Sequence, residues 1–152
     1  MKIRIEIEES LEEEIVIRCK ELTPRILRYQ QMLNDEINKL SQLVLYREDT
    51  EYYIAPDDIL FFETDDAEVY AHTAKDVYET RRKLYQLEEI LPSSFMRISK
   101  SAIVNTDKIY SIKRNLSASS AIEFAGTHKQ IYVSRIYYKV LKEKLEEKRY
   151  EK

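Results

Sequence analysis

The chain has 152 residues, of which 43% are hydrophobic and 35% charged, and its formal net charge is −3. This length suits one ordinary domain with a short additional element, and the hydrophobic share is sufficient for a real core. No apolar run approaches the roughly 20 residues that cross a bilayer, no signal peptide opens the chain, and the single cysteine, Cys19, excludes an intrachain disulfide. These features predict a cytoplasmic protein, with Cys19 as a small half-buried residue.

Charge is unevenly distributed along the chain. Residues 1–92 contain 12 basic and 22 acidic side chains, whereas residues 93–152 contain 13 basic and 6 acidic ones. A segregated basic region can bind nucleic acid on an acidic protein, because phosphates respond to the potential within a Debye length of roughly 10 Å. Seven cations of this basic region stand almost unopposed in the sequence: Arg97, Lys100, Lys108, Lys113, Arg114, Lys129 and Arg135.

The first 42 residues predict a strand–strand–helix extension. Residues 2–8 alternate apolar and charged side chains, which is typical of a strand, and residues 15–19 predict a second short strand. Thr23 and Pro24 are typical of a helix start, and apolar residues recur at helical spacing from Ile26 to Leu40. Such a small unit buries little by itself. Its helical stripe either covers the rest of the chain or forms a dimer seam.

From residue 43 the pattern is mainly that of short strands. Residues 43–46 and 52–54 flank one acidic turn and residues 59–63 and 68–72 flank another, so two hairpins are expected. A helix is predicted over residues 80–91 because Pro92 ends it. The remaining expectations are strands near 95–98, 109–112, 121–124 and 130–133, a short turn over 101–105, and a closing helix from Ser134 with Ile136, Val140, Leu141 and Leu145 inward. The predicted fold is therefore mainly β with peripheral helices, in a domain over residues 43–146 followed by a charged tail over 147–152.

The sequence contains no catalytic constellation. His72 and His128 form no zinc-binding spacing, and His72 is interpreted as a strand residue whose ring meets polar neighbours. Ser99 and Ser101 lack the glycine-framed turn of a serine nucleophile. A Gly-rich phosphate loop is excluded because the chain has one glycine. We therefore expect no enzyme activity, no cofactor, no metal and no small-molecule substrate.

The segment from Phe95 to Asn105 sets polar donors between apolar anchors. Four donors, Arg97, Ser99, Lys100 and Ser101, are followed at once by three apolar residues. An anchored loop with outward donors suits contact with phosphates or base edges in a DNA groove. The same composition also fits an ordinary loop in which Asn105 and Asp107 only cap local turns. Composition alone leaves both interpretations open.

Three stretches, in order and spacing, resemble the LytTR DNA-binding domain over residues 43–146. They are residues 59–64 with 69–73, residues 87–92 running into Phe95–Asn105, and Val133-Ser134-Arg135 ahead of the closing helix. The resemblance implies a mostly β body of small antiparallel sheets that inserts loops into successive major grooves. It further implies a bacterial transcription regulator whose partner is double-stranded DNA at promoter direct repeats.

The resemblance also implies which side chains contact DNA. Lys100 occupies a DNA-reaching position, Ser101 beside it suits a phosphate, and Arg135 reads a base; a bidentate arginine–guanine contact is worth roughly 1–3 kcal/mol of discrimination. Arg97 supports the loop or touches the DNA backbone, while Asn105 fixes a turn. The other expected DNA-binding residues are Ser99 and Ser134, which belong to the matching motifs, and Lys113 and Arg114, which are chosen on charge alone.

The third contact loop that the resemblance implies departs from the family pattern. It falls on Asp65, Asp66, Ala67 and Glu68, where the family usually has His or Asn. Acidic side chains repel phosphates, so either this loop stands off from DNA or Glu68 accepts a hydrogen bond from a cytosine amino group.

The regulatory arrangement is expected to be simple. Residues 1–42 are too short for the receiver domain that most regulators of this family carry, so no phospho-aspartate switch is expected. We expect a homodimer, and the resemblance points to control by a neighbouring membrane protein. An alternative is a protein-interaction adaptor that binds a basic partner through the acidic N-terminal portion.

Overall fold

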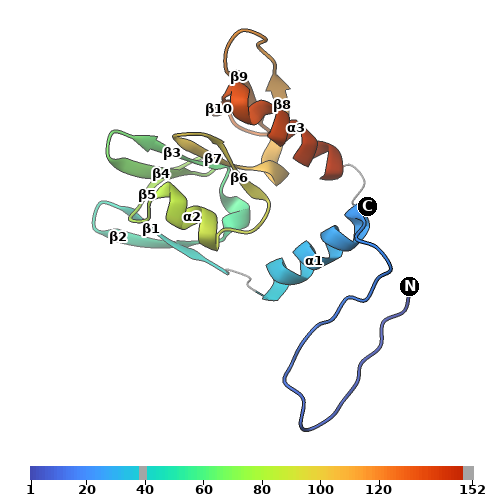
Figure 1. Ribbon diagram of the computed structural model, residues 1–152. Coiled ribbons are helices and arrows are strands. Elements are labelled where there is room, and N and C mark those ends of the chain that lie inside the picture. The colour runs from blue at the N-terminus through green and yellow to red at the C-terminus, as the bar shows by residue number, and fades with distance from the viewer. Residues whose placement is uncertain (38–40, 149–152) are drawn as a thin grey trace. The chain divides into compact units, whose positions relative to one another are not determined.

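The computed structural model describes residues 1–37 and 41–148, which belong to two compact units (Figure 1). Residues 1–37 form one unit and contain one helix, α1 (Pro24–Ile37). The amide of Ile26 donates to Thr23 Oγ1 over 3.3 Å, so the predicted helix start is confirmed. Ile26, at the start of the apolar stripe of α1, is half-buried and not fully buried. Leu40, at the end of the stripe, lies outside the described residues.

The two strands predicted over residues 2–8 and 15–19 do not form in this unit. Residues 1–23 are extended without strand pairing, apart from a turn in which the amide of Leu11 donates to the carbonyl of Glu8 over 3.1 Å. Alternation describes a strand only where a neighbouring strand supplies hydrogen-bond partners, and residues 1–37 supply none. Cys19 is exposed rather than half-buried.

The second unit is built on two antiparallel sheets. The larger sheet has the order β2-β1-β5-β4-β3-β7-β6, and the smaller has the order β10-β9-β8. The strands of the larger sheet are β1 (Leu43–Arg47), β2 (Thr50–Ile54), β3 (Phe61–Asp65), β4 (Glu68–His72), β5 (Val77–Thr80), β6 (Phe95–Ser99) and β7 (Ala102–Asn105). Those of the smaller sheet are β8 (Ile109–Lys113), β9 (Ser120–Phe124) and β10 (Gln130–Val133), and the helices are α2 (Leu84–Ile90) and α3 (Arg135–Lys148). Short 3₁₀ turns, η1 (Pro56–Asp58) and η2 (Thr106–Lys108), complete the unit, so the predicted fold class is confirmed.

Two hydrophobic clusters lie on opposite faces of the larger sheet. Neighbouring side chains of a strand point to opposite faces, so Phe62 of β3 packs with Leu84 and Leu87 of α2, while Phe61 packs with the smaller sheet and Leu141 of α3. All five side chains are buried. Burial on both faces holds β3 and its partner β7 rigidly in the centre of the domain.

Two segments differ from the predicted pattern because strand pairing prevails over local preference. Residues 77–80 form β5 between β1 and β4, with Tyr78 and Thr80 buried, so the predicted helix over 80–91 begins only at Leu84. The turn predicted over 101–105 is limited to Lys100 and Ser101, because residues 102–105 form the strand β7 between β3 and β6.

The closing helix buries a different face from the one predicted. Leu141 is fully buried and Leu145 packs beside it, as expected. Ile136 and Val140, however, are 85% and 53% exposed, and Tyr137 and Tyr138 pack on the cluster in their place. The tyrosine rings present more apolar area to the small sheet than the aliphatic side chains do.

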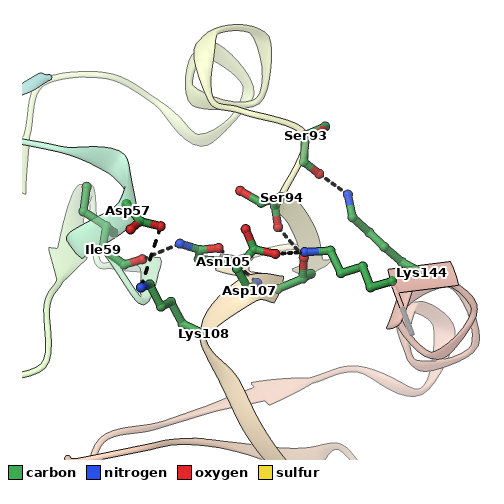
Figure 2. A network of polar contacts seen from close by, with 10 residues as sticks. Asp57, Ile59, Ser93, Ser94, Asn105, Asp107, Lys108 and Lys144 are labelled. Atoms are coloured by element: carbon green, nitrogen blue, oxygen red, sulfur yellow. Dashed lines mark hydrogen bonds and ion pairs between the residues drawn. The ribbon is translucent and has the colours of Figure 1, made fainter. Parts of the chain in front are cut away.

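Polar contacts hold the chain after β7 in place (Figure 2). Asn105 is buried; its Nδ2 donates to the carbonyl of Ile59 over 3.0 Å and its Oδ1 accepts from the amide of Asp107 over 3.1 Å. The prediction that Asn105 fixes a turn is confirmed by these bonds. Lys148 of α3 pairs with Asp107, which ties the closing helix to the same turn.

Candidate nucleic-acid interface

The turn between β6 and β7 presents the first predicted contact residues. The strands pair from Phe95↔Asn105 to Ser99↔Ala102, with a register shift between Arg97 and Ser99. The Ser99 hydroxyl accepts from the amide of Ser101 over 3.1 Å, so it is engaged inside the turn. Lys100 is exposed at its tip. Two neighbouring strands and this local bond therefore give the Lys100 backbone a defined position.

Arg97 is engaged in supporting this turn. Its Nη1 donates to the carbonyl of Lys100 over 3.0 Å, and its Nε and Nη2 lie 3.3 and 3.4 Å from the two carboxylate oxygens of Glu88 in α2. A guanidinium held bidentately has little freedom to reach another group. Of the two roles predicted for Arg97, the structure favours support of the loop.

The start of α3 lies against the same hairpin. The amide of Ser134 donates to the carbonyl of Ile98 over 2.9 Å, and the Ser134 carbonyl accepts from Tyr138 over 2.9 Å. Ser134 thereby links the first turn of α3 to β6. The next residue, Arg135, is exposed. Residues distant in the sequence, Lys100 and Arg135, are brought to one region of the domain by this bond.

A shallow depression of about 130 Å³ adjoins Arg135. Its lining residues are Arg114, Asn115, Leu116, Ala118, Ser120, Arg135 and Tyr138. The Arg114 guanidinium lies 5.1 Å above the Tyr138 ring, a cation–π arrangement that orients it. Sequence reasoning missed Tyr138 and Asn115 here, although Tyr138 follows Arg135 by three residues on a helix and so shares its face. The oriented Arg114 guanidinium at this hollow suits a phosphate.

The folded domain separates the seven cations that stand almost unopposed in the sequence into three that have polar partners and four that have no acidic partner in the described residues. Arg97 binds Glu88, Lys108 lies 3.7 Å from Asp57, and Lys129 Nζ donates to the Asp76 carbonyl over 2.6 Å. The other four are exposed and have no acidic partner within the described residues: Lys100, Lys113, Arg114 and Arg135. All four belong to the predicted contact set, which also includes Ser101, exposed beside Lys100.

The acidic turn between β3 and β4 lies beside the basic turn. The amide of Thr64 donates to the carbonyl of Ser101 over 2.9 Å. Asp65 and Glu68 lie directly opposite each other in the register of the β3–β4 hairpin. Asp66 has a left-handed φ of 54°, which Asp tolerates in tight turns. The acidic departure from the family pattern therefore borders the candidate interface and lowers its positive potential.

The histidine in β4 is a structural residue. His72 stacks on Phe61 with 4.4 Å between ring centroids, and its Nε2 lies 2.8 Å from Glu63 Oε1. Burial, together with the Lys129 charge, lowers the pKa of His72 to about 4, so the ring is neutral at pH 7. The prediction of a strand histidine with polar neighbours is confirmed. Within the described residues, no group of three His, Cys, Asp or Glu side chains is arranged to hold a metal ion.

The fold and the comparison with known proteins define the class as a DNA-binding domain. Residues 49–146 match the family described as the LytTr DNA-binding domain. The chain therefore belongs to the LytTR family, which is a family of DNA-binding domains and not of enzymes.

Relatives and a solved structure agree with this assignment. The chain is 34% identical over 112 residues to an uncharacterized HTH-type transcriptional regulator of Staphylococcus aureus strain NCTC 8325 / PS 47, which covers 73% of this chain and 75% of the relative. A similarly named protein of strain MRSA252 is 33% identical over 112 residues, which again cover 73% of this chain and 75% of the relative. A solved LytTr DNA-binding domain from Bacillus cereus superposes with a TM-score of 0.63 at 21% identity, covering 68% of this chain and 95% of that one, and shows the same fold.

The described part of this chain contains no helix-turn-helix unit. Within residues 41–148 the two helices α2 and α3 are separated by five strands. No helix in the described residues is long and apolar enough to cross a membrane.

Proposed function

We propose that the protein is a cytoplasmic bacterial transcription regulator that binds promoter DNA sequence-specifically, through the β6–β7 turn and the start of α3 inserted into the major groove. The observation that carries this proposal is the separation of the seven cations into engaged and free ones. Of these seven, the four without an acidic partner in the described residues lie on the β6–β7 turn, at and just after the end of β8, and at the start of α3. A surface that keeps its cations free is suited to phosphates.

The contact residues have separate roles in this proposal. Arg135 reads a base edge, whereas Lys100, Lys113 and Arg114 bind phosphates, because a lysine ammonium acts as a point charge and an arginine can present a fork. Ser101 hydrogen-bonds a phosphate next to Lys100. Arg97, Ser99 and Ser134 position the contacts, since their polar atoms already bond the turn and the first turn of α3.

Two copies are proposed to occupy paired repeats, as in proteins that this chain resembles. A single domain with a few free cations binds weakly at physiological salt, and two linked domains gain affinity through effective concentration. Control by a neighbouring membrane protein is the corresponding proposal for the signal.

Selection of bound sequences from random duplex, followed by titration of single variants, tests the assignment. We expect a recurring repeat among the selected sequences. Arg135→Ala should lose roughly 10-fold or more of the preference for that repeat over scrambled duplex, because a base contact is removed. Lys113→Ala should weaken both duplexes alike.

The opposite outcomes are equally specific. A native chain that retards no duplex at low salt contradicts DNA binding and favours the adaptor alternative. A preference unchanged by Arg135→Ala contradicts the base-reading role of Arg135.

A further inference from the structure

Residues 2–8 form a two-sided extended arm that pairs with no strand in the part of the chain that the structure describes. Ile3, Ile5 and Ile7 are 95, 83 and 93% exposed, although isoleucine is among the most commonly buried residues. The side chains between them are charged, and Arg4 Nη2 lies 2.6 Å from Glu6 Oε1, so both charges point to the same side of the arm. The backbone of residues 2–8 has no strand partner within residues 1–37.

The order of charges along this arm is self-complementary. On the polar side Lys2 and Arg4 come first, followed by Glu6 and Glu8. An antiparallel pairing of two copies centred on Ile5 sets Lys2 opposite Glu8 and Arg4 opposite Glu6. On the other side it sets isoleucine opposite isoleucine. Opposite charges across a pair of strands stabilise it, and like charges destabilise it.

Neighbouring registers and the parallel pairing lack this match. Centring the antiparallel pair on Arg4 sets Arg4 opposite itself, and centring it on Glu6 sets Glu6 opposite itself. A parallel in-register pair aligns all four like charges. A shift by one residue moves the isoleucines to the charged side. Only the register centred on Ile5 satisfies both faces.

We propose that residues 2–8 form an antiparallel two-stranded ribbon with the same residues of a second copy, about a two-fold axis at Ile5. The proposal deepens the two-copy part of the proposed function by naming its contact. It is an isologous interface, in which each residue meets its complement on the partner. The ribbon gathers six isoleucines on one face, and Ile15 and Val16 of the same unit, both exposed, supply apolar side chains to cover it.

Pairing within one chain fits the charges less well. Residues 15–19 contain a single charged side chain, Arg18, and the edge strand β2 (Thr50–Ile54) contains only Glu51. Neither segment can match two cations followed by two carboxylates. A second copy matches all four.

Charge exchange on the full chain tests the ribbon. The native chain should sediment as a dimer, whereas Lys2→Glu/Arg4→Glu and Glu6→Lys/Glu8→Lys should each sediment as a monomer, since every register then opposes like charges. An equimolar mixture of these two variants should form a heterodimer, and the fourfold exchange should restore the homodimer. A variant that fails only because it is misfolded cannot be rescued by its complement. A monomeric native chain, a dimeric double variant or an unpaired mixture overturns the proposal.

Disulfide cross-linking tests the register. In a Cys19→Ser background, Ile5→Cys should cross-link to itself under mild oxidation, because directly opposed Cα atoms lie roughly 4.5–5.5 Å apart. Ile3→Cys should not cross-link to itself, since positions 3 of the two copies are about 13 Å apart, but it should cross-link to Ile7→Cys. Self-linkage of Ile3→Cys as efficient as that of Ile5→Cys overturns the register.

The two proposals fail separately. The arm variants leave Lys100 and Arg135 intact, so each should still bind a single half-site duplex. The change of net charge should weaken this binding in Lys2→Glu/Arg4→Glu and strengthen it in Glu6→Lys/Glu8→Lys. Loss of dimer mass with retained half-site binding supports the arm, whereas a dimer that binds no duplex contradicts only the proposed function.

Discussion

His72 shows how the neighbours of one residue determine its chemistry. Its Nε2–H donates to Glu63, and its Nδ1 is buried without a hydrogen-bond partner in the described residues, which is consistent with a neutral ring. Glu63 favours the imidazolium, but desolvation outweighs it and Lys129 adds repulsion, so the pKa lies at about 4. Desolvation also raises the pKa of Glu63 itself.

The lowered pKa predicts acid sensitivity of folding between pH 6.5 and 4. In this window the unfolded chain, with an ordinary pKa of about 6.5, takes up a proton that the folded chain excludes, so stability falls as pH falls. We expect the free energy of unfolding to decrease by about 2 kcal/mol from pH 7.5 to pH 5 relative to a His72→Gln variant. Urea titration of both proteins at the two pH values measures this difference. Parallel pH dependence of the two proteins would show that His72 takes up its proton in the folded chain at the ordinary pKa, which contradicts the lowered pKa.

At the scale of elements, the proposed function gives α2 a positioning role in DNA binding. Glu88 holds Arg97, which in turn holds the Lys100 carbonyl at the tip of the β6–β7 turn. Removal of an acidic charge ordinarily strengthens DNA binding. Loss of this support has the opposite effect, because the turn then pays an ordering cost when it docks.

Whether Glu88→Ala weakens or strengthens duplex binding therefore distinguishes a positioning role of Glu88 from a purely electrostatic one. Glu88→Ala should weaken duplex binding severalfold, whereas the matched control Glu89→Ala, the exposed next residue on α2, should leave it unchanged or slightly stronger. Fluorescence anisotropy with a labelled duplex compares the two variants. Equal strengthening by both substitutions would contradict the positioning role of Glu88 and Arg97.

The β3–β4 turn makes a separate prediction because it adjoins the basic turn. Asp65→Asn/Asp66→Asn should strengthen binding to every duplex by roughly 3- to 10-fold, since two charges that repel phosphates are removed. Glu68→Gln discriminates the two roles predicted for this loop. If Glu68 accepts a hydrogen bond from a cytosine amino group, Glu68→Gln should lower the preference for the selected site. If the loop stands off from DNA, Glu68→Gln should strengthen binding to every duplex, as the aspartate substitutions do. Weaker binding of the Asp65/Asp66 variant to all duplexes would contradict this electrostatic account.

Elements with strong local patterns are predictable from the sequence, and elements defined by distant pairing are not. The β1–β2 and β3–β4 hairpins, the start of α1 and the capping role of Asn105 follow from alternation and from turn and cap residues. β5 is missed because its neighbours β1 and β4 decide its state, and the arm at residues 2–8 has strand alternation but no strand partner within residues 1–37. The site shows the same limit: sequence spacing selects cations, but only the fold shows that Lys108 and Lys129 are engaged while Lys113 is free.

At the scale of the whole molecule, symmetry links the two proposals. A rigid two-fold dimer favours inverted half-sites, because operator symmetry mirrors protein symmetry. The family resemblance instead implies direct repeats. Selected sites in direct orientation would show that paired arms join two copies without imposing their own symmetry on the DNA-binding domains.

The proposed function makes four cations of the C-terminal basic region the DNA-binding surface, and a charge-matched comparison tests this assignment most directly. One variant replaces Lys100, Lys113, Arg114 and Arg135 by alanine; its control replaces four exposed cations elsewhere, Lys20, Arg25, Lys75 and Arg82. Both lose the same charge. Duplex affinity is measured by anisotropy from 50 to about 200 mM salt, the range over which phosphate contacts are lost.

We predict that the interface variant loses roughly 100-fold in affinity and that its salt slope falls by about three, since three phosphate contacts are lost and each removes nearly one released counterion. The control should keep the native slope and lose little affinity. Equal losses in both variants would show that total charge, and not this surface, governs binding.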